Sequence, residues 1–441
     1  NHVPEWGQPL IKQAAIAGRE LDIAVIESLR GDVDLELWLS TCVNVALLDA
    51  VEEDYRFAHD KLREMLVNQL DEADLKQSHR DVAIAIETVH HADDYAQALA
   101  FHWQKAGDFQ KEFDYTLKSN TKLQDLAFHI EALPQSRRLF ELYDILKMDD
   151  EVMAAELHFN IGYNYHGVGE FDLANEHYLK NLSISEKIDN PSMVAQVLGN
   201  LGVLARLTGD FEAALNYGER TIEVAKRSDN HSATATAYVN TGIINAMQGN
   251  VPEAKTHFLN AKNLSEEHNI DSTLSTSLIS LGILHSMIEE FNEAKQSFSA
   301  AMQVMEREHN YSNMAACALS LGDVHLALEE YGDAFKQYHY GMKTASDAGV
   351  PSIVLNGMIS IAHSIFKREQ AEKYIWAVQL LHMANLHPLT DYDNKQKTEQ
   401  IFETYKELLQ NADISTDEPP SVDIYPELIE QCMAFLSGKT S

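Results

Sequence analysis

Between residues 151 and 349 the sequence repeats itself every 40 residues. In each of five units a glycine is followed by an alanine twelve residues later and by a serine thirty residues later. Three residue types that keep one period predict a stack of similar structural units rather than one compact core. The glycines are Gly162, Gly202, Gly242, Gly282 and Gly322, the alanines are Ala174, Ala214, Ala254, Ala294 and Ala334, and the serines are Ser192, Ser232, Ser272, Ser312 and Ser352.

Each unit is predicted to be a helical hairpin. The serine fits a helix N-cap, so we expect a first helix such as 193–207, a turn at Thr208-Gly209-Asp210 and a second helix from Phe211. The glycine inside the first helix costs about 1 kcal/mol relative to alanine. Its repetition predicts that the second helix, with its periodic alanine, approaches closely at this point.

These residues resemble a tetratricopeptide repeat array of the long, 40-residue type found in kinesin light chains. The resemblance rests on pairs such as Leu201-Gly202 and on the aromatic residue four positions after each alanine, which is replaced by Gly218, beside Tyr217, in the second unit. It implies an all-α, right-handed superhelix that binds a partner and is not an enzyme. The aromatic residues are Tyr178, Phe258, Phe298 and Tyr338.

Four further segments flank the five repeats at 151–350. Residues 1–80 are expected to form three short helices, a β-hairpin around Val51-Glu52-Glu53 and a helix from His59, an arrangement like a winged helix. The expected third helix, 35–43, contains no Lys or Arg, which favours a connector over a DNA reader. Irregular hairpins (81–150), a degenerate repeat with capping helices (351–410), and a linker with a terminal helix (411–441) complete the chain.

A second resemblance covers about residues 8–145. The phrases at 14–21, 55–64, 79–87 and 100–109 are similar to the segment that follows the nucleotide-binding module in bacterial signal-transduction ATPases of the STAND type. This resemblance implies a winged helix that joins an ATPase module, expected before residue 1, to a repeat sensor array. Its effector partners would be cyclases, kinases or DNA-binding domains.

Composition excludes several functions. Sixty-eight acidic and 34 basic residues give a net charge of −34, which disfavours nucleic-acid binding. Cys42, Cys317 and Cys432 are too scattered for a disulfide framework or metal site, and no apolar run is long enough to span a membrane, so a cytoplasmic protein without cofactor is expected. The stretch 437–441 mimics a phosphate loop but lacks its first glycine.

Histidines do not predict a metal site. His90 and His91 are adjacent and point about 100° apart on a helix, so they do not converge on one ion. His285 and His325 lie one period apart, three residues after their glycines. We expect both to be core histidines.

The best functional candidates lie two residues before each glycine. In tetratricopeptide superhelices this position faces the concave groove, where an amide can donate to and accept from the main chain of an extended peptide. Arg206 is the expected contact for an acidic group. The alternatives are a standalone scaffold and a small-molecule sensor of a transcriptional regulator. The candidate groove residues are Asn160, Asn200, Asn240, Ser280, Ser320, Tyr163, His166, Arg206, Ile243 and Met247, with Val239 among their neighbours.

Overall fold

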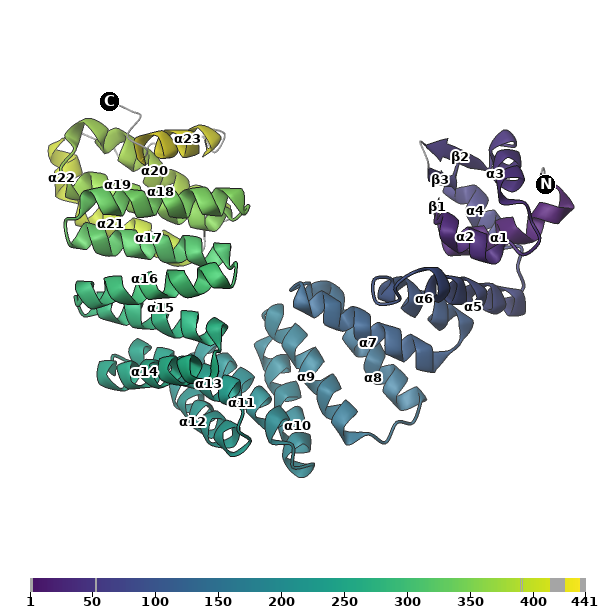
Figure 1. Cartoon of the computed structure of the whole chain (residues 1–441), viewed down its shortest axis with the longest axis horizontal. Coiled ribbons are helices and arrows are strands. Elements are labelled where there is room, and N and C mark those ends of the chain that lie inside the picture. Colours follow the sequence, from purple (N-terminus) through teal and green to yellow (C-terminus); the bar gives the residue numbers. More distant parts are fainter. Residues whose placement is uncertain (1–2, 52–53, 389, 391, 413–424, 437–441) are drawn as a thin grey trace. The chain divides into compact units, whose positions relative to one another are not determined.

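The computed structural model describes residues 3–51, 54–388, 390, 392–412 and 425–436. The chain divides into two compact units, Asn1–Asn190 and Pro191–Ser441. Figure 1 shows both units as series of paired helices, with a small sheet near the N-terminus. The predicted linker around 411–426 and the stretch 437–441 fall largely or wholly outside the described residues.

The N-terminal part of the first unit combines short helices with a three-stranded sheet. The strand order is β1-β3-β2, all antiparallel, with Glu20 opposite Arg56 and Leu48 opposite Phe57. The core around Trp38 and Phe57 is fully buried. The elements are η1 (Glu5–Gly7), α1 (Gln8–Ala17), β1 (Glu20–Leu21), α2 (Ile23–Leu29), α3 (Leu35–Asn44), β2 (Leu48–Val51), β3 (Asp54–Phe57) and α4 (Asp60–Val67).

The expected helices and hairpin of this part are present, but the strand β1 was missed. The sequence analysis predicts no strand before the β-hairpin, whereas α1 ends at Ala17, because Gly18 follows in a backbone conformation that is not helical, and Glu20 and Leu21 form a strand. Leu21 then pairs with Tyr55. A strand of two residues depends on its partner and carries no periodicity of its own. Assignment to the winged-helix class stays a prediction.

The rest of the first unit consists of helices packed as consecutive neighbours, α5 with α6, α7 with α8 and α9 with α10. Helix α5 runs through residue 80, where a domain boundary was expected, and the boundaries stay predictions. The helices are α5 (Glu72–Val89), α6 (Ala96–Ala106), α7 (Phe109–Asp125), α8 (His129–Ile145), α9 (Glu151–Gly167) and α10 (Phe171–Lys187).

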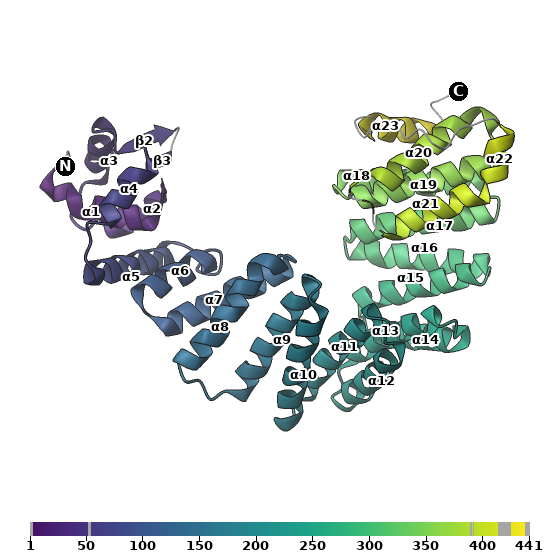
Figure 2. The ribbon, with the colours of Figure 1, turned by 180° about the vertical axis from the view of Figure 1, so that it is seen from behind.

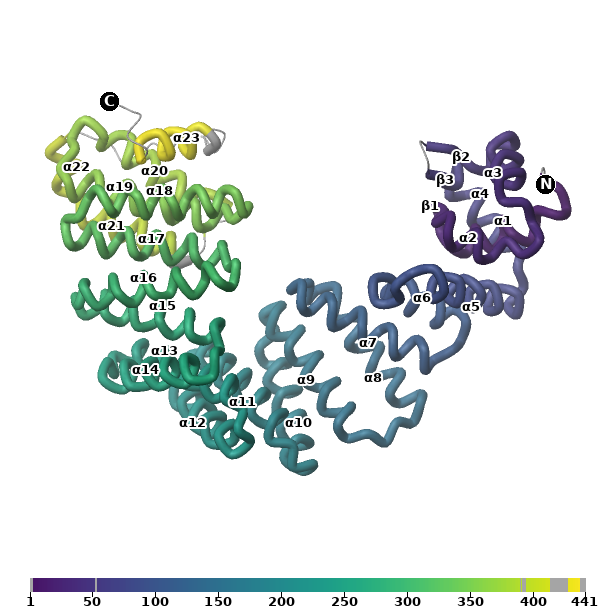
Figure 3. Tube along the Cα trace, viewed as in Figure 1, coloured from purple at the N-terminus to yellow at the C-terminus, as the bar shows by residue number. Residues whose placement is uncertain are grey.

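The second unit is a stack of helical hairpins, as predicted, and Figure 3 traces it from α11 to α20. Its helices are α11 (Pro191–Leu207), α12 (Phe211–Arg227), α13 (His231–Met247), α14 (Val251–His268), α15 (Asp271–Met287), α16 (Phe291–Arg307), α17 (Tyr311–Ala327), α18 (Tyr331–Asp347), α19 (Pro351–Lys367), η2 (Ala371–Lys373), α20 (Tyr374–Leu386), α21 (Tyr392–Thr404), α22 (Lys406–Asn411) and α23 (Tyr425–Leu436).

The periodic serines were expected to be N-caps, but they are not. Each lies in the first turn of its helix, and the cap is two residues earlier: the side chain of Asn230 accepts from the Ala233 amide at 3.0 Å, and Asn310 accepts from Asn313 at 3.3 Å. Asparagine caps as well as serine does, so in these two repeats residue preference alone left two candidates, two residues apart. The N-caps Ile270 and Val350 make no side-chain hydrogen bond. The capping helices expected within 351–410 include α21 and α22, which are separated at Tyr405.

The expected close approach at the periodic glycines is present, and an aromatic ring makes it. A Cβ added to Gly322 would lie 2.5 Å from the ring of Tyr338, and one added to Gly242 would lie 2.6 Å from Phe258. At Gly202 the nearest atom would be 3.5 Å away, because Gly218 supplies no ring. Glycine is therefore required by a neighbouring ring in four of the repeats but not in the second.

Candidate functional site

The first helices of successive hairpins in the second unit, α11, α13, α15, α17 and α19, contact one another as well as their hairpin partners. The second helices of successive hairpins approach each other less closely. We call the surface of α11, α13, α15 and α17 that carries residues 200, 240, 280 and 320 the inner face. These four side chains are all half-buried, so they are neither locked in the core nor fully turned into solvent.

The polar side chains of the inner face differ in how free they are. The Asn200 amide donates to the Gln196 carbonyl of its own helix at 3.0 Å, which leaves its carbonyl oxygen as an acceptor. Ser280 and Ser320 also donate back to their own helices, at 2.9 and 3.3 Å. The Asn240 side chain makes no hydrogen bond with any described residue. The inner face of this unit therefore offers two side-chain amides to a ligand, Asn200 and Asn240, and not one amide in every repeat.

Apolar side chains lie beside these polar ones. Ile243 is half-buried, and Met247 is 55% exposed. Ile283 and Met287 of the next hairpin are 48% and 63% exposed. Val239, expected as a further groove neighbour, is wrong for that role because it is only 3% exposed and packs in the core. Flexible, exposed methionines suit a surface that adapts to a partner.

Arg206 is half-buried on α11 and lines a narrow recess between α11 and α13. Its guanidinium forms no ion pair with the described acidic residues. The chain holds twice as many acidic as basic residues, so a cation without a partner stands out here. It is available to a carboxylate or phosphate group.

The remaining candidates lie on α9, in the first unit. Asn160 is half-buried, and its main-chain oxygen accepts from Gln124 at 2.8 Å. Tyr163 packs edge-on against His129, with ring centroids 5.2 Å apart, and stays 36% exposed. His166 is half-buried beside Phe171. These three are placed together on one helix, but they belong to a different unit from Asn200 and Asn240.

Asp323 is an inner-face residue that the sequence analysis missed. It occupies the place of Ile243 and Ile283, accepts from the Tyr338 hydroxyl at 2.9 Å and pairs with Lys397 of α21 at 3.1 Å. Burial acts to raise the pKa of Asp323, but Lys397 and the hydrogen bonds outweigh it and leave the pKa lowered. Figure 2 shows α21 lying across α17 and α19, so the chain itself covers this end of the inner face.

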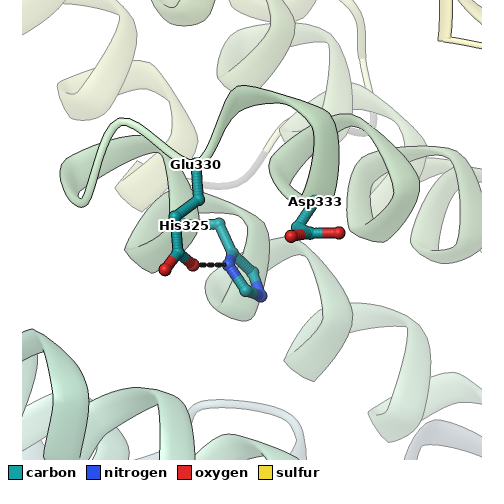
Figure 4. A group of neighbouring side chains, drawn as sticks. All are labelled: His325, Glu330 and Asp333. Carbon is teal, nitrogen blue, oxygen red and sulfur yellow. Dashed lines mark hydrogen bonds and ion pairs between the residues drawn. The ribbon is translucent and has the colours of Figure 1, made fainter.

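His325, Glu330 and Asp333 are close enough to share a metal ion (Figure 4). His325 Nδ1 lies 2.6 Å from Glu330 Oε2, and Lys295 Nζ lies 2.8 Å from the same oxygen. The cation held here is thus an ammonium group. His285 is buried too, like His325, and both are core histidines as expected.

The same link occurs one repeat earlier. Lys255 bonds to Glu290 at 3.1 Å, with His285 Nε2 3.7 Å from that carboxylate. In both cases a lysine of one second helix reaches the glutamate at the N-terminus of the next second helix. We interpret the cluster as a repeated link between hairpins.

A depression of about 540 Å³ opens between α11 and α13. An inner recess of about 10 Å³ shares Gly199, Val203, Thr221, Ala237 and Asn240 with it and reaches Gly202 and Gly218. The recess holds no more than a water molecule. The depression lies within the range of ligand sites. The sequence signal for it was the absence of large side chains at 199 and 218.

Comparisons with known proteins agree with this fold. The family model for tetratricopeptide repeats matches residues 152–227 and, overlapping them, 193–267, which confirms these repeats. A sequence search among curated proteins finds no match. No described helix has the length and apolar character needed to cross a membrane.

Three solved structures are similar in fold. The apo form of the quorum sensor NprR from B. thuringiensis has a TM-score of 0.55 at 11% identity, over 81% of this chain and 97% of that one. Apo RapI has a TM-score of 0.51 at 14% identity, over 66% and 99%. A STAND protein with a tetratricopeptide repeat sensor from Pyrococcus horikoshii has a TM-score of 0.45 at 14% identity, over 97% of this chain. The chain spans 65% of the length of that protein.

Proposed function

We propose that the second unit binds an extended peptide or protein segment on its inner face and that the chain has a non-catalytic, sensing role. The observation that carries the proposal is the combination of two uncharged amides, Asn200 and Asn240, with exposed apolar side chains on the inner face. An amide recognises a peptide main chain through one donor and one acceptor and does not select its side chains. The fold shared with a quorum sensor is in keeping with a sensing role.

The test is a selection of random dodecapeptides by the immobilised chain, followed by titration of an enriched peptide. Asn200→Ala/Asn240→Ala should weaken binding by about tenfold or more, since two hydrogen bonds are lost. The matched control is Asn216→Ala, which removes the same amide from an exposed position on α12. Binding that survives the double substitution unchanged, or no enrichment at all, would count against the inner face.

We also propose that the chain belongs to the sensor region of a STAND-type signalling ATPase. The support is the sequence resemblance over residues 8–145 together with the order of elements in the N-terminal part, where three helices and β1 precede the β2–β3 hairpin. Residues 8–145 would link the repeats to a nucleotide-binding module. The test is the gene sequence upstream of residue 1, which should encode a phosphate-binding loop.

A further inference from the structure

The depression between α11 and α13 exists because one position lacks a side chain. Residue 199 is glycine, and a Cβ built on it would meet no atom within 4 Å. The same place in the other four repeats is taken by Phe159, Val239, Ile279 and Leu319. Val239 and Leu319 are buried there, so the second repeat is the one in which the space between neighbouring hairpins is left unfilled at this position.

The lining of the depression is uncharged. Ala195, Gly199 and Ala237 line it together with polar side chains such as Thr221, and none of the residues that line it is Asp, Glu, Lys or Arg. Asn200 of α11 and Asn240 of α13 also line it. Arg206 lines the inner recess but not the depression, so a charged occupant of the depression would lose its hydration and meet no counter-charge in the lining.

We propose that this depression is the anchor pocket for an aromatic side chain, Phe or Tyr, of the extended peptide bound by the inner face. The inference rests on the proposed function and adds the residue class that the site selects. The main chain of the peptide lies against Asn200 and Asn240, and the ring enters between α11 and α13 over Gly199.

Two observations favour a ring over other neutral side chains. Ala195, Gly199 and Ala237 leave space between α11 and α13, and a rigid ring that enters this space buries a large apolar area. The protein fills the equivalent position of α9 with the ring of Phe159, whose centroid lies 6.3 Å from that of the Tyr163 ring.

The experiment restores the missing side chain. Gly199→Phe introduces the residue that the first repeat carries there, and Gly199→Leu introduces the residue of the fifth. If circular dichroism shows that one variant does not fold, the other is used. The control is Gly332→Phe, at an exposed position of α18 where an added Cβ also meets nothing. The probe is the random dodecapeptide library, followed by one enriched peptide and its aromatic→Ala version.

The expected result is an aromatic residue at one shared position of the enriched peptides. Gly199→Phe or Gly199→Leu should bind the enriched peptide about tenfold or more weakly, because a ring is no longer buried. Gly332→Phe should bind it as wild type does, and the alanine peptide should bind wild type and Gly199→Phe equally. Enriched peptides without a shared aromatic position, or undiminished binding to both Gly199 variants, would overturn the anchor pocket and leave the proposed function standing. No enrichment by the wild type would defeat the proposed function itself.

Discussion

The contrast between Gly202 and Gly322 gives the sharpest prediction about stability. Either residue changed to alanine gains helix propensity worth about 1 kcal/mol. At Gly322 the new methyl group would lie 2.5 Å and 2.6 Å from two ring carbons of Tyr338, which is fully buried. At Gly202 its nearest neighbour would be 3.5 Å away, an ordinary contact.

The Tyr338 ring has little room to move. Its hydroxyl donates to Asp323 at 2.9 Å. Burial, as the larger cause, and the Asp323 carboxylate, as the smaller one, raise the pKa of Tyr338 well above its usual value. Overpacking of this kind costs about 1–3 kcal/mol. We therefore expect Gly202→Ala to raise the free energy of unfolding by up to about 1 kcal/mol, and Gly322→Ala to lower it by about 0–2 kcal/mol.

The assay is urea denaturation followed by circular dichroism, with hydrogen exchange to locate the change, because hairpins of a repeat array can unfold separately. Gly242→Ala should resemble Gly322→Ala, since its methyl group would meet Phe258 at 2.6 Å. Gly199→Ala, with nothing nearby, should resemble Gly202→Ala. If Gly322→Ala proves as stable as Gly202→Ala, the packing of rings on glycines does not explain the period.

Three further predictions concern pH and ion pairs. His79 and His102 face each other in the first unit at 3.0 Å, and burial lowers the pKa of each from 6.5 to about 4. As the pH falls, the unfolded chain binds protons at these histidines before the folded chain does. The stability that depends on their neutral form is therefore complete above pH 6.5 and is lost as the pH falls toward 4. Hydrogen exchange of α5 and α6 at about pH 7 and about pH 5 should show this loss. Lys397→Met should destabilise α21 by on the order of 1 kcal/mol, because Asp323 keeps its partly buried charge without a cation; unchanged exchange in α21 would contradict this. Lys295→Met should have a small effect on urea stability that disappears in high salt, because the Glu330 side chain is exposed to solvent.

Much of the fold could be read from local patterns. The period of 40 and the small residues at 162, 174 and their equivalents predicted hairpins, and α12 begins at Phe211 as expected. Helix starts were less accurate, because asparagine and serine are both good caps and lie two residues apart. The strand β1 was missed, because its only support is a partner 34 residues away.

The candidate site was predicted in part. Residue register placed Asn200, Asn240 and Ile243 on one face, and all three are half-buried in the structure. Their role in binding stays a prediction. Register did not show that Val239 turns into the core or that Asn200 bonds to its own helix, because a repeat period fixes an average direction and not a rotamer or a partner.

The sequence by itself determined that this chain is a stack of helical hairpins, because the spacing of small and aromatic residues is a local property that recurs in each repeat. Only the tertiary structure decided which parts of the inner face stay open. Lys397 brings α21 onto Asp323 from 74 residues away, and Gly199 leaves a hollow whose size depends on how α11 and α13 pack. The contact of Lys397 with Asp323 joins segments far apart in the chain, and no repeat period encodes it. The hollow lies between neighbouring repeats, and the period predicts that they pack but not how closely.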